Sequence, residues 1–362
     1  MNVMLFSRIV AKSGVGNHMK QLSEELVKQG HAVTVVSSIN ELDIGGGTSS
    51  VDFICLPPIS LNPIAMVKGI KNLHDIIKRK QIQVVHCHHR MAALYMKLYR
   101  VLFNIPVVYT LHLADIPSDY LHKKATYAGD KAIGVSTEVS DFLVEKLDVP
   151  RNKVITICNG VDEKQLSLLI DDEKQSLHKN WSVPIDSTVF VMHSRIDEVK
   201  NHLLVVNAVK EMPKEYRDKI VFLCSGTQAG TYYEKVKKTI KNYDLEKNFI
   251  FTGWIETRKL LGIADALVLP STNEGFPLSV VEAFLMKIPV LRTRTGGFDD
   301  QKYCIEISKT NAMDVAYSMM SFVDNKDDYK KSTEEAFQYA MNNFTIERMT
   351  EKTVEVYSMI SK

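Results

Sequence analysis

The first part of the chain alternates two hydrophobic patterns. Short runs of almost continuous apolar residues are typical of strands buried on both faces of a parallel sheet. Between them, apolar residues recur every three or four positions, which is typical of helices with one buried face. The runs predict strands at residues 3–10, 32–37, 52–56, 84–87, 106–111, 132–135 and 154–158. The spaced patterns predict helices at residues 16–29, 65–79, 91–102 and 139–147.

A second series of the same kind follows a charged stretch without strand signals. It predicts strands at residues 188–193, 220–224, 249–252, 266–269 and 290–291. It predicts helices at residues 202–211, 232–241, 257–263 and 278–286, and a wholly helical end at residues 327–361. Parallel strands need right-handed crossovers, which these helices supply. We therefore expect an α/β protein with two Rossmann-like, doubly wound parallel-sheet domains that face a cleft at the carboxyl ends of their strands.

The same patterns predict the domain boundaries. Residues 1–165 are expected to form the N-terminal domain and residues 185–345 the C-terminal domain, with a linker at residues 166–184. The length of 362 residues agrees with two domains of roughly 150 residues each. No apolar run approaches the ~18 residues of a membrane span, and the N-terminus lacks a signal-peptide cleavage site. The five cysteines are widely spaced, so we expect buried, reduced thiols in a cytoplasmic protein.

Charge narrows the range of partners. A net charge of +2 is too small for a general nucleic-acid-binding protein, so no nucleic acid is expected as a partner. The excess of positive charge lies in residues 68–100, as Lys68, Lys71, Lys78, Arg79, Lys80, Arg90, Lys97 and Arg100. A basic amphipathic helix can bind an anionic membrane surface, here one that carries a lipid-linked acceptor. A solvated helix face is the alternative interpretation.

The stretch from Pro270 to Ala283 carries the most informative candidate chemistry. A strand ends at Pro270, a loop with Gly and Pro follows, and a helix begins near Leu278. The free amide groups and positive dipole end of such a helix favour a phosphate. Glu274 in the loop and Glu282 one turn into the helix can accept hydrogen bonds from the hydroxyls of a ribose and a sugar. Solvated glutamates are the alternative, which the apolar surroundings of Glu282 make less favourable.

A second candidate segment follows the first strand of the second series. Arg195 offers a planar fork of donors and Lys200 a mobile point charge, and both lie in one strand-to-helix loop. Together they can hold a diphosphate and stabilise the charge that grows on it as a leaving group. The alternative is a surface salt bridge with Asp197 or Glu198, worth about 0–1 kcal/mol. We favour the diphosphate because of the neighbouring glutamate segment.

Candidate residues of the first domain carry weaker signals. Gly14 and Gly16 form a G-x-G without the third glycine of a dinucleotide loop, so they more plausibly let a substrate approach the backbone. His86 and His88 share a face of an extended stretch, which raises the possibility of a metal site. Hydrogen bonding to a polar substrate or to the backbone is the favoured alternative. His112 follows a strand and is the preferred functional histidine.

At this point the residues resemble a known family. Glu274-x7-Glu282, preceded by Pro270-Ser271 and followed by Gly296-Gly297, is similar to the E-x7-E segment of retaining family-4 glycosyltransferases with the GT-B fold. Four further segments agree with that family in their order along the chain: Gly30-His31, Thr110-x-His112, Asn159-Gly160-Val161-Asp162 and Arg195…Lys200. The resemblance implies transfer of a sugar from a nucleotide diphosphate sugar, expected to be a UDP-sugar, to a saccharide or lipid-linked acceptor with retention. Cell-surface polysaccharide or glycolipid assembly is the expected context, and a final helix at residues 346–362 is expected to cross back to the N-terminal domain.

The resemblance also implies roles for individual residues. Glu282 would hold the ribose, Glu274 the donor sugar, and Arg195 and Lys200 the diphosphate. The remaining implied contacts are phosphate-binding amides around Gly275, Phe276, Leu278 and Ser279, a place for His112 beside the transferred sugar, and Gly14 and Gly16 bordering the diphosphate and acceptor. Trp254 is expected near the nucleobase, with a core position as the alternative.

No metal or other cofactor is expected, because the family needs none and the chain has no D-x-D segment. The implied reaction is a front-face displacement in which the departing phosphate accepts the acceptor's proton. Arg292 and Arg294 stand where the family has small or acidic residues, so we hypothesise that one of them binds an anionic group of a substrate. Surface arginines are the alternative.

Two other functions would suit the same architecture. A nucleotide-sugar epimerase would use the same phosphate site without an acceptor. A non-catalytic sugar-binding partner would have lost the site, and the presence of both glutamates, the arginine and the lysine argues against it.

Overall fold

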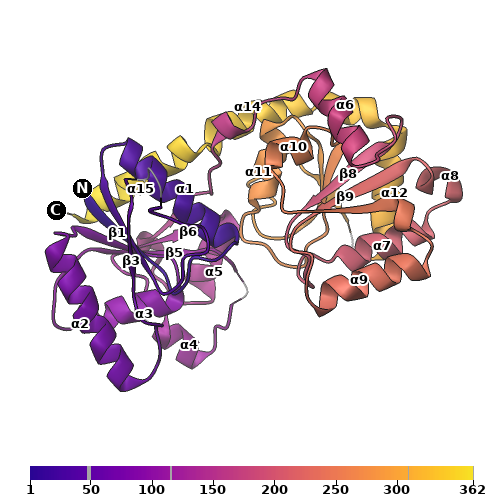
Figure 1. Ribbon diagram of the computed structural model, residues 1–362. Helices are drawn as coiled ribbons and strands as arrows, with labels where there is room; N and C mark the ends of the chain where they lie inside the picture. Colours follow the sequence, from indigo (N-terminus) through magenta and orange to yellow (C-terminus); the bar gives the residue numbers. More distant parts are fainter. Residues whose placement is uncertain (47–49, 115, 309, 362) are drawn as a thin grey trace. The chain divides into compact units, whose positions relative to one another are not determined.

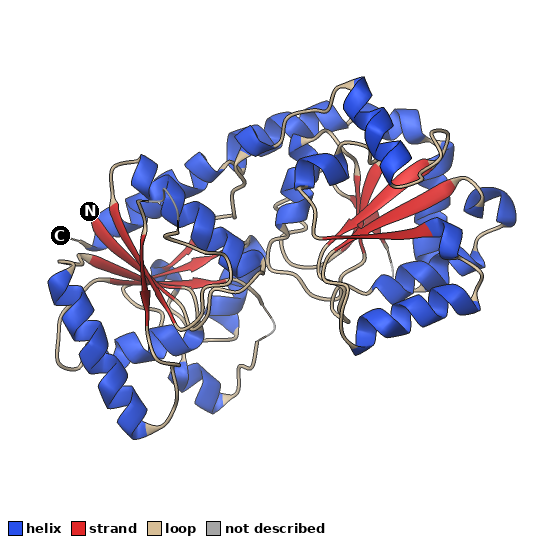
Figure 2. Ribbon diagram, viewed as in Figure 1, coloured by secondary structure: helices blue, strands red, loops and turns tan. Residues whose placement is uncertain are grey.

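The computed structural model describes residues 1–46, 50–114, 116–308 and 310–361. The chain forms two units, each with a sheet that has helices on both faces (Figures 1 and 2). The first unit contains Met1–Val161 and the C-terminal residues from Asn343 onward, and the second contains Asp162–Asn342. Residues 166–184, for which the sequence predicted a linker, are instead part of the second unit and include a helix, α6 (Asp171–Asn180).

The sheet of the first unit is parallel, with the strand order β3-β2-β1-β4-β5-β6-β7. Its strands are β1 (Asn2–Phe6), β2 (Ala32–Ser37), β3 (Asp52–Cys55), β4 (Val84–Cys87), β5 (Val107–Leu111), β6 (Lys131–Gly134) and β7 (Val154–Thr156). Its helices are α1 (Gly14–Lys28), α2 (Pro63–Arg79), α3 (Arg90–Tyr99), α4 (Tyr120–Ala125), α5 (Thr137–Glu145) and α15 (Ile346–Ile360). The direction of winding reverses between β1 and β4, which makes the ends of these strands the expected ligand site.

Most helices of the first unit begin at a short polar side chain that caps them. The Ser13 hydroxyl accepts a hydrogen bond from the Gly16 amide at 3.3 Å, and Asn62 caps α2 ahead of Pro63. Such caps satisfy amides that have no partner inside the helix. The chain leaves α1 through Gly30, whose φ of +83° suits a residue without a Cβ.

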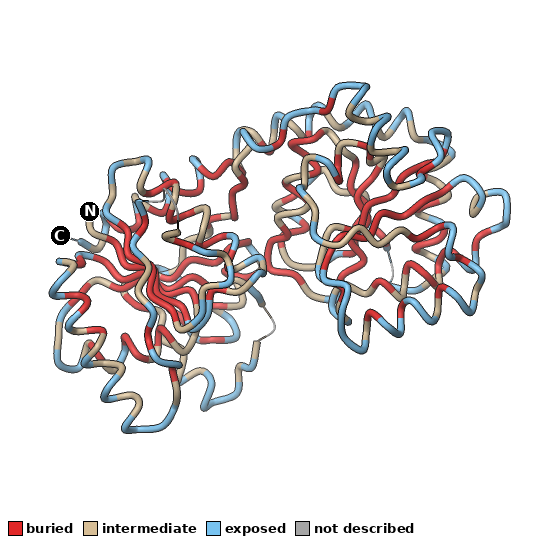
Figure 3. Tube along the Cα trace, viewed as in Figure 1, coloured by how far each residue is buried: buried red, intermediate tan, exposed pale blue. Residues whose placement is uncertain are grey.

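The last helix, α15, belongs to the core of the first unit. Thr345 forms a β-bridge with Val161, and Ile346, Met349 and Tyr357 are buried together with apolar side chains of α1 and the sheet. Figure 3 shows the buried strands of this sheet between more exposed helices. The predicted return of the final helix to the N-terminal domain is therefore confirmed.

The sheet of the second unit is also parallel, with the strand order β10-β9-β8-β11-β12-β13. Its strands are β8 (Thr188–His193), β9 (Ile220–Ser225), β10 (Phe249–Gly253), β11 (Ala266–Leu269), β12 (Val290–Thr293) and β13 (Ile305–Ile307). Besides α6, its helices are α7 (His202–Glu211), α8 (Lys214–Arg217), α9 (Thr231–Asn242), α10 (Thr257–Leu261), α11 (Leu278–Leu285), α12 (Ala312–Asp324), α13 (Lys326–Lys331) and α14 (Thr333–Asn343). The winding reverses between β8 and β11, so the loops after these two strands hold the expected ligand site.

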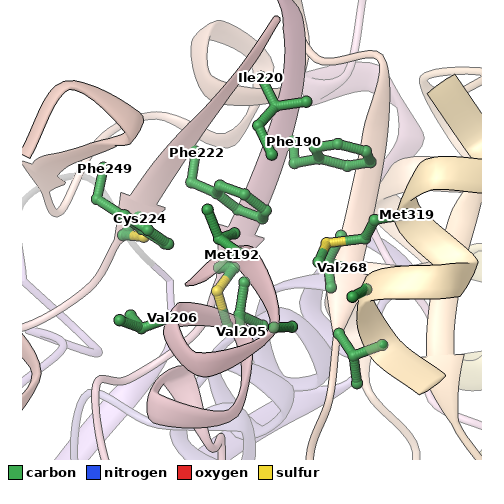
Figure 4. Packing of buried hydrophobic residues seen from close by; sticks show 14 of the residues in the cluster. Phe190, Met192, Val205, Val206, Ile220, Phe222, Cys224, Phe249, Val268 and Met319 are labelled. Atoms are coloured by element: carbon green, nitrogen blue, oxygen red, sulfur yellow. The ribbon is translucent and has the colours of Figure 1, made fainter. Parts of the chain in front are cut away.

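Aromatic, aliphatic and sulfur-containing side chains together fill the core of the second unit (Figure 4). The ring of Phe222 on β9 stacks against Phe190 on β8 and Phe249 on β10, with ring centroids 5.2 and 4.9 Å apart. Offset aromatic stacking adds to the burial of apolar area. This stack fixes three neighbouring strands behind the loops that hold the candidate site.

Two simpler expectations are tested by burial and helix length. Cys87 and Cys224 are free, buried thiols as expected, whereas Cys55 is exposed at the end of β3. Within the described residues, every helix is too short or too polar to cross a membrane.

Candidate active site

The predicted donor-binding segments come together in the second unit. The loop after β8 and the loop after β11 are joined by a hydrogen bond from the Thr272 amide to the Val199 carbonyl, at 2.9 Å. Lys200 Nζ lies 2.5 Å from Glu274 Oε1, and both side chains are largely buried. The predicted phosphate-binding lysine and the predicted sugar-binding glutamate thus form a direct ion pair at the switch point of the sheet.

The start of α11 presents uncapped backbone amides beside this pair. Pro277 occupies the N-cap position and makes no side-chain capping hydrogen bond, so the first-turn amides at Leu278 and Ser279 are available to an anion. Gly275 and Phe276 are buried in the loop that leads to the helix. A Cβ on Gly296 would lie 2.2 Å from the Glu274 carbonyl oxygen, so glycine at this position allows the two loops to pack closely.

Glu282 lies one turn into α11 and faces a second buried titratable group. Its Oε2 atom is 3.5 Å from Nε2 of His193, the last residue of β8. Burial raises the pKa of Glu282 to about 7 and lowers the pKa of His193 to about 4. Because His193 is neutral at pH 7, the contact is not an ion pair, and a partly protonated Glu282 can both donate and accept hydrogen bonds with a diol.

The raised pKa of Glu282 predicts a signed effect of pH on stability. The folded state binds a proton more tightly than the unfolded state, whose carboxyl has a pKa near 4.5. The stabilisation is therefore complete below pH 4.5 and is lost as pH rises through 7, by up to roughly 3 kcal/mol. Glu282→Gln should remove this dependence. The unfolding free energy of the wild type should therefore fall relative to that of the variant as the pH is raised from 5 to 8. Urea denaturation at several pH values measures it, and a constant difference would contradict the assignment.

Arg195 is more exposed than Lys200, Glu274 and Glu282. Its guanidinium is 54% exposed and contacts Asp197, with Nη2 3.2 Å from Oδ2. The surface salt bridge considered from the sequence is therefore present in the unliganded chain. Because an exposed pair of this kind is weak, a diphosphate can compete with Asp197 for the guanidinium.

Three histidines of the first unit, His18 of α1 with His88 and His112 at the ends of β4 and β5, form a largely buried cluster. His88 Nδ1 lies 3.1 Å from His112 Nε2, and the ring of His18 on α1 lies 4.8 Å from that of His112. Desolvation lowers the pKa of His18 to about 4 and the pKa values of His88 and His112 well below the usual 6.5. The cluster therefore offers neutral imidazoles at physiological pH.

His86 has a structural role, unlike its neighbours. Its Nδ1 lies 2.7 Å from the Tyr357 hydroxyl and its Nε2 lies 2.6 Å from Thr110 Oγ1, so both ring nitrogens are used. His86, one of the two metal ligands considered from the sequence, thus has both ring nitrogens paired within the chain. Candidate ligand atoms of His18, His88 and His112 do lie within 4.8 Å of one another, a set that can hold either a transition metal or the hydroxyls of a polar substrate.

Comparison with known proteins identifies the family. The family model "Glycosyltransferase Family 4" matches residues 12–165, and the model "Glycosyl transferases group 1" matches residues 173–339. The chain belongs to glycosyltransferase family 4. Among curated relatives of this glycosyltransferase, the N-acetyl-alpha-D-glucosaminyl L-malate synthase of Bacillus anthracis is 23% identical, over 78% of this chain and 76% of the relative.

Solved structures show that the glycosyltransferase has the GT-B fold. A glycosyltransferase from Rickettsia africae ESF-5 superposes with a TM-score of 0.88 at 23% identity, over 100% of this chain and 99% of that chain. HepE of Anabaena, in a complex with UDP-glucose, superposes with a TM-score of 0.84 at 15% identity, over 99% and 100% of the two chains. The predicted fold class and family are both confirmed.

Other predicted site residues of the glycosyltransferase have mixed outcomes. Trp254 is 52% exposed and donates a hydrogen bond to Thr227 Oγ1 at 3.0 Å, so the alternative of a core aromatic is wrong. A Cβ on Gly14 would meet no atom within 4 Å, which leaves its amide region open to a substrate. A Cβ on Gly16 would lie 2.0 Å from the Ala11 carbonyl oxygen, so this glycine is explained by packing inside the first unit.

The hypothesis of a substrate-binding arginine is wrong for Arg292. Its side chain is fully buried and donates hydrogen bonds to backbone and side-chain oxygens of the following loop. Arg294 is 53% exposed and pairs with Asp299 and Glu306. The strand pattern could not separate these positions, because residues two apart in a strand share one face. They differ because β12 ends at Thr293, so Arg292 lies in the strand and Arg294 follows it.

Sequence reasoning missed one histidine among the candidate residues of each unit. His18 lies one turn beyond Gly14 on α1, a spacing that would have placed it on the same helix face. His193 is the last residue of β8, two residues before Arg195. Because it ends a predicted strand, the sequence indicated its position at the carboxyl edge of the sheet.

Proposed function

We propose that the protein transfers a sugar from a UDP-sugar to an acceptor hydroxyl with retention of configuration. The observation that carries this proposal is the Lys200–Glu274 ion pair beside the uncapped start of α11. A cation, free amides and a hydroxyl-binding carboxylate at one switch point suit the diphosphate and the sugar of one donor molecule. The complex of HepE with UDP-glucose supports the choice of base.

In this mechanism the second unit stabilises the leaving group. Lys200, Arg195 and the amides of α11 hold the diphosphate while negative charge develops on it. Glu274 orients the donor sugar rather than attacking it, and Glu282 binds the ribose hydroxyls. The departing phosphate accepts the proton of the attacking hydroxyl, so no resident metal is required. Trp254 is proposed to lie beside the nucleobase.

We propose that the first unit binds the acceptor and the transferred sugar. His112 and its neighbours His18 and His88 supply neutral imidazole nitrogens, which accept or donate hydrogen bonds to sugar hydroxyls. The open space at Gly14 lets the substrate approach the start of α1. We place the protein in the cytoplasm, in polysaccharide or glycolipid assembly.

The exposed residues of α2 support the proposal that the acceptor is lipid-linked. Leu73, Ile76 and Ile77, which belong to the apolar face of this basic helix, are buried in the first unit and so are not exposed to a membrane. On the opposite face, Ile64 and Val67 are each 69% exposed and are followed by exposed Lys68 and Lys71. Exposed apolar residues next to basic ones suit the headgroup region of an anionic membrane. We therefore propose peripheral membrane contact through α2.

Charge removal on α2 is expected to weaken this contact. The Lys68→Gln, Lys71→Gln double variant should reduce binding to phosphatidylglycerol-containing vesicles by about 30-fold, at about 1 kcal/mol for each basic residue. Liposome flotation measures the bound fraction. Ile185→Asp, at an exposed apolar position of the second unit, is a control that should bind as the wild type does. Flotation without any dependence on anionic lipid would contradict the proposal.

A panel of nucleotide sugars tests the proposed function directly. A donor at 100 times its Kd should stabilise the protein by ~2.7 kcal/mol in a thermal shift experiment. Uridine donors should shift the transition more than guanosine donors do. Product formation that requires an added acceptor would distinguish transfer from epimerisation, since an epimerase acts on the nucleotide sugar alone. Absence of any shift with every nucleotide sugar would contradict the proposal.

A further inference from the structure

A buried arginine lies directly behind the donor loop, Glu274–Pro277. Arg292 on β12 is fully buried, and its Nη2 donates hydrogen bonds to Thr295 Oγ1 at 2.9 Å and to the Gly296 carbonyl at 3.0 Å. Its Nη1 donates to the side-chain oxygen of Gln301, which is fully buried as well. A buried guanidinium requires such partners because its desolvation is unfavourable. Through these hydrogen bonds, Arg292 holds together the segment that follows β12.

One connection runs from Arg292 to the start of α11. While its side-chain oxygen accepts from Arg292, Gln301 Nε2 donates a hydrogen bond to the Pro277 carbonyl at 3.0 Å. Pro277 is the N-cap residue of α11 and makes no capping bond with its own side chain. Gln301 therefore fixes the orientation of the peptide bond between Pro277 and Leu278, where the first turn of α11 begins.

A second connection runs from Arg292 to the other end of the donor loop. Arg292 holds the carbonyl of Gly296, and a Cβ on that glycine would lie 2.2 Å from the Glu274 carbonyl oxygen and 2.9 Å from that of Gly275. The Gly296 turn therefore packs directly on the backbone of Glu274. One guanidinium in this way reaches both ends of the four-residue donor loop.

We propose that Arg292 and Gln301 are positioning residues for sugar transfer. They hold the Glu274 backbone and the first turn of α11 in the arrangement that binds the diphosphate, without contacting the donor themselves. The inference rests on the proposed function, because it assumes that this loop binds a nucleoside diphosphate. A loop held from behind is preorganised, and small displacements of a positioned group reduce the rate of the reaction strongly.

Gln301→Glu is a sharp test of this inference. The new carboxylate still accepts from Arg292, which keeps it ionised, but it has no N–H to donate to the Pro277 carbonyl. We expect about tenfold weaker binding of UDP by isothermal titration calorimetry, a change of about 1.4 kcal/mol. We also expect a higher KM and a lower kcat for the sugar donor, with a nucleotide-free melting temperature close to that of the wild type. Gln175→Glu adds the same charge at an exposed position of α6 and should leave UDP binding unchanged.

Two further measurements separate positioning from a merely structural role. Hydrogen exchange of the nucleotide-free protein should be faster at residues 274–280 in Gln301→Glu than in Gln175→Glu. Arg292→Lys keeps the charge but loses the fork of donors, and it should reproduce the weaker UDP binding if it folds. Equal exchange and equal UDP affinity in Gln301→Glu and wild type would overturn the inference. A wild type that binds no nucleoside diphosphate would instead contradict the proposed function, and the exchange experiment would still decide whether the pair holds the loop.

Discussion

Replacement of Lys200 by methionine is expected to lower kcat/KM for the donor sugar by about 10²–10³-fold. This is the usual effect of removing one well-placed donor from a group that gains negative charge in the transition state. Lys200 Nζ is held 2.5 Å from Glu274 Oε1, so its charge is already in position before the donor binds. The loss should appear in kcat as well as in kcat/KM, because the phosphate gains charge as the sugar departs. Steady-state kinetics with a varied donor concentration measures both constants.

Stability must be separated from catalysis in this variant. Lys200→Met leaves Glu274 as a buried carboxylate without its cation, which can destabilise a protein by about 3–5 kcal/mol. The double variant with Glu274→Gln removes the stranded charge, so it should recover stability but not activity. Lys210→Met, at an exposed lysine of α7, is the matched control and should behave as the wild type does. A Lys200→Met enzyme that retains more than about a tenth of the wild-type kcat/KM would contradict the role of this lysine.

Hydrophobic pattern predicted most of the fold because both sheets are parallel and buried on both faces. Runs such as residues 188–193 and 266–269 became strands with the predicted bounds, β8 and β11. The pattern missed the short elements α4, α8 and β13, of six, four and three residues, which give little periodic signal. It also missed two longer helices, the mostly polar α6 of ten residues and α12 of thirteen residues. It also extended the first strand to residue 10, whereas β1 ends at Phe6. Of the apolar residues beyond that point, Val10 is buried outside the strand, whereas Ile9 is 41% exposed.

The candidate site was predictable where its residues follow strands directly. Lys200 and Glu274 lie far apart in the sequence, yet the loops after β8 and β11 bring them together because these strands are neighbours in the sheet. The burial of Arg292 was not predictable in the same way. Its partners Thr295, Gly296 and Gln301 come from an irregular loop, whose course no periodic pattern describes.

Substitution of Phe222 by alanine is expected to lower the stability of the second unit strongly. The side chain is fully buried between the rings of Phe190 and Phe249 (Figure 4). Removal of a buried aromatic ring leaves a cavity and typically lowers the free energy of unfolding by about 3–5 kcal/mol. The loss should be confined to the second unit, because the two units have separate hydrophobic cores. Differential scanning calorimetry should therefore show a lower transition for this unit and an unchanged one for the first.

Binding of UDP should restore part of the stability that Phe222→Ala removes from the second unit. UDP at 100 times its Kd stabilises the unit that binds it by ~2.7 kcal/mol, which recovers a large part of the expected deficit. Phe251→Ala is the matched control, because Phe251 lies on the edge strand β10 and is only partly buried. If Phe251→Ala lowered the transition temperature as much as Phe222→Ala does, the stacked rings of Phe190, Phe222 and Phe249 would not be what stabilises the sheet. If UDP shifted the transition of the first unit instead, the donor site would not lie on the loops after β8 and β11.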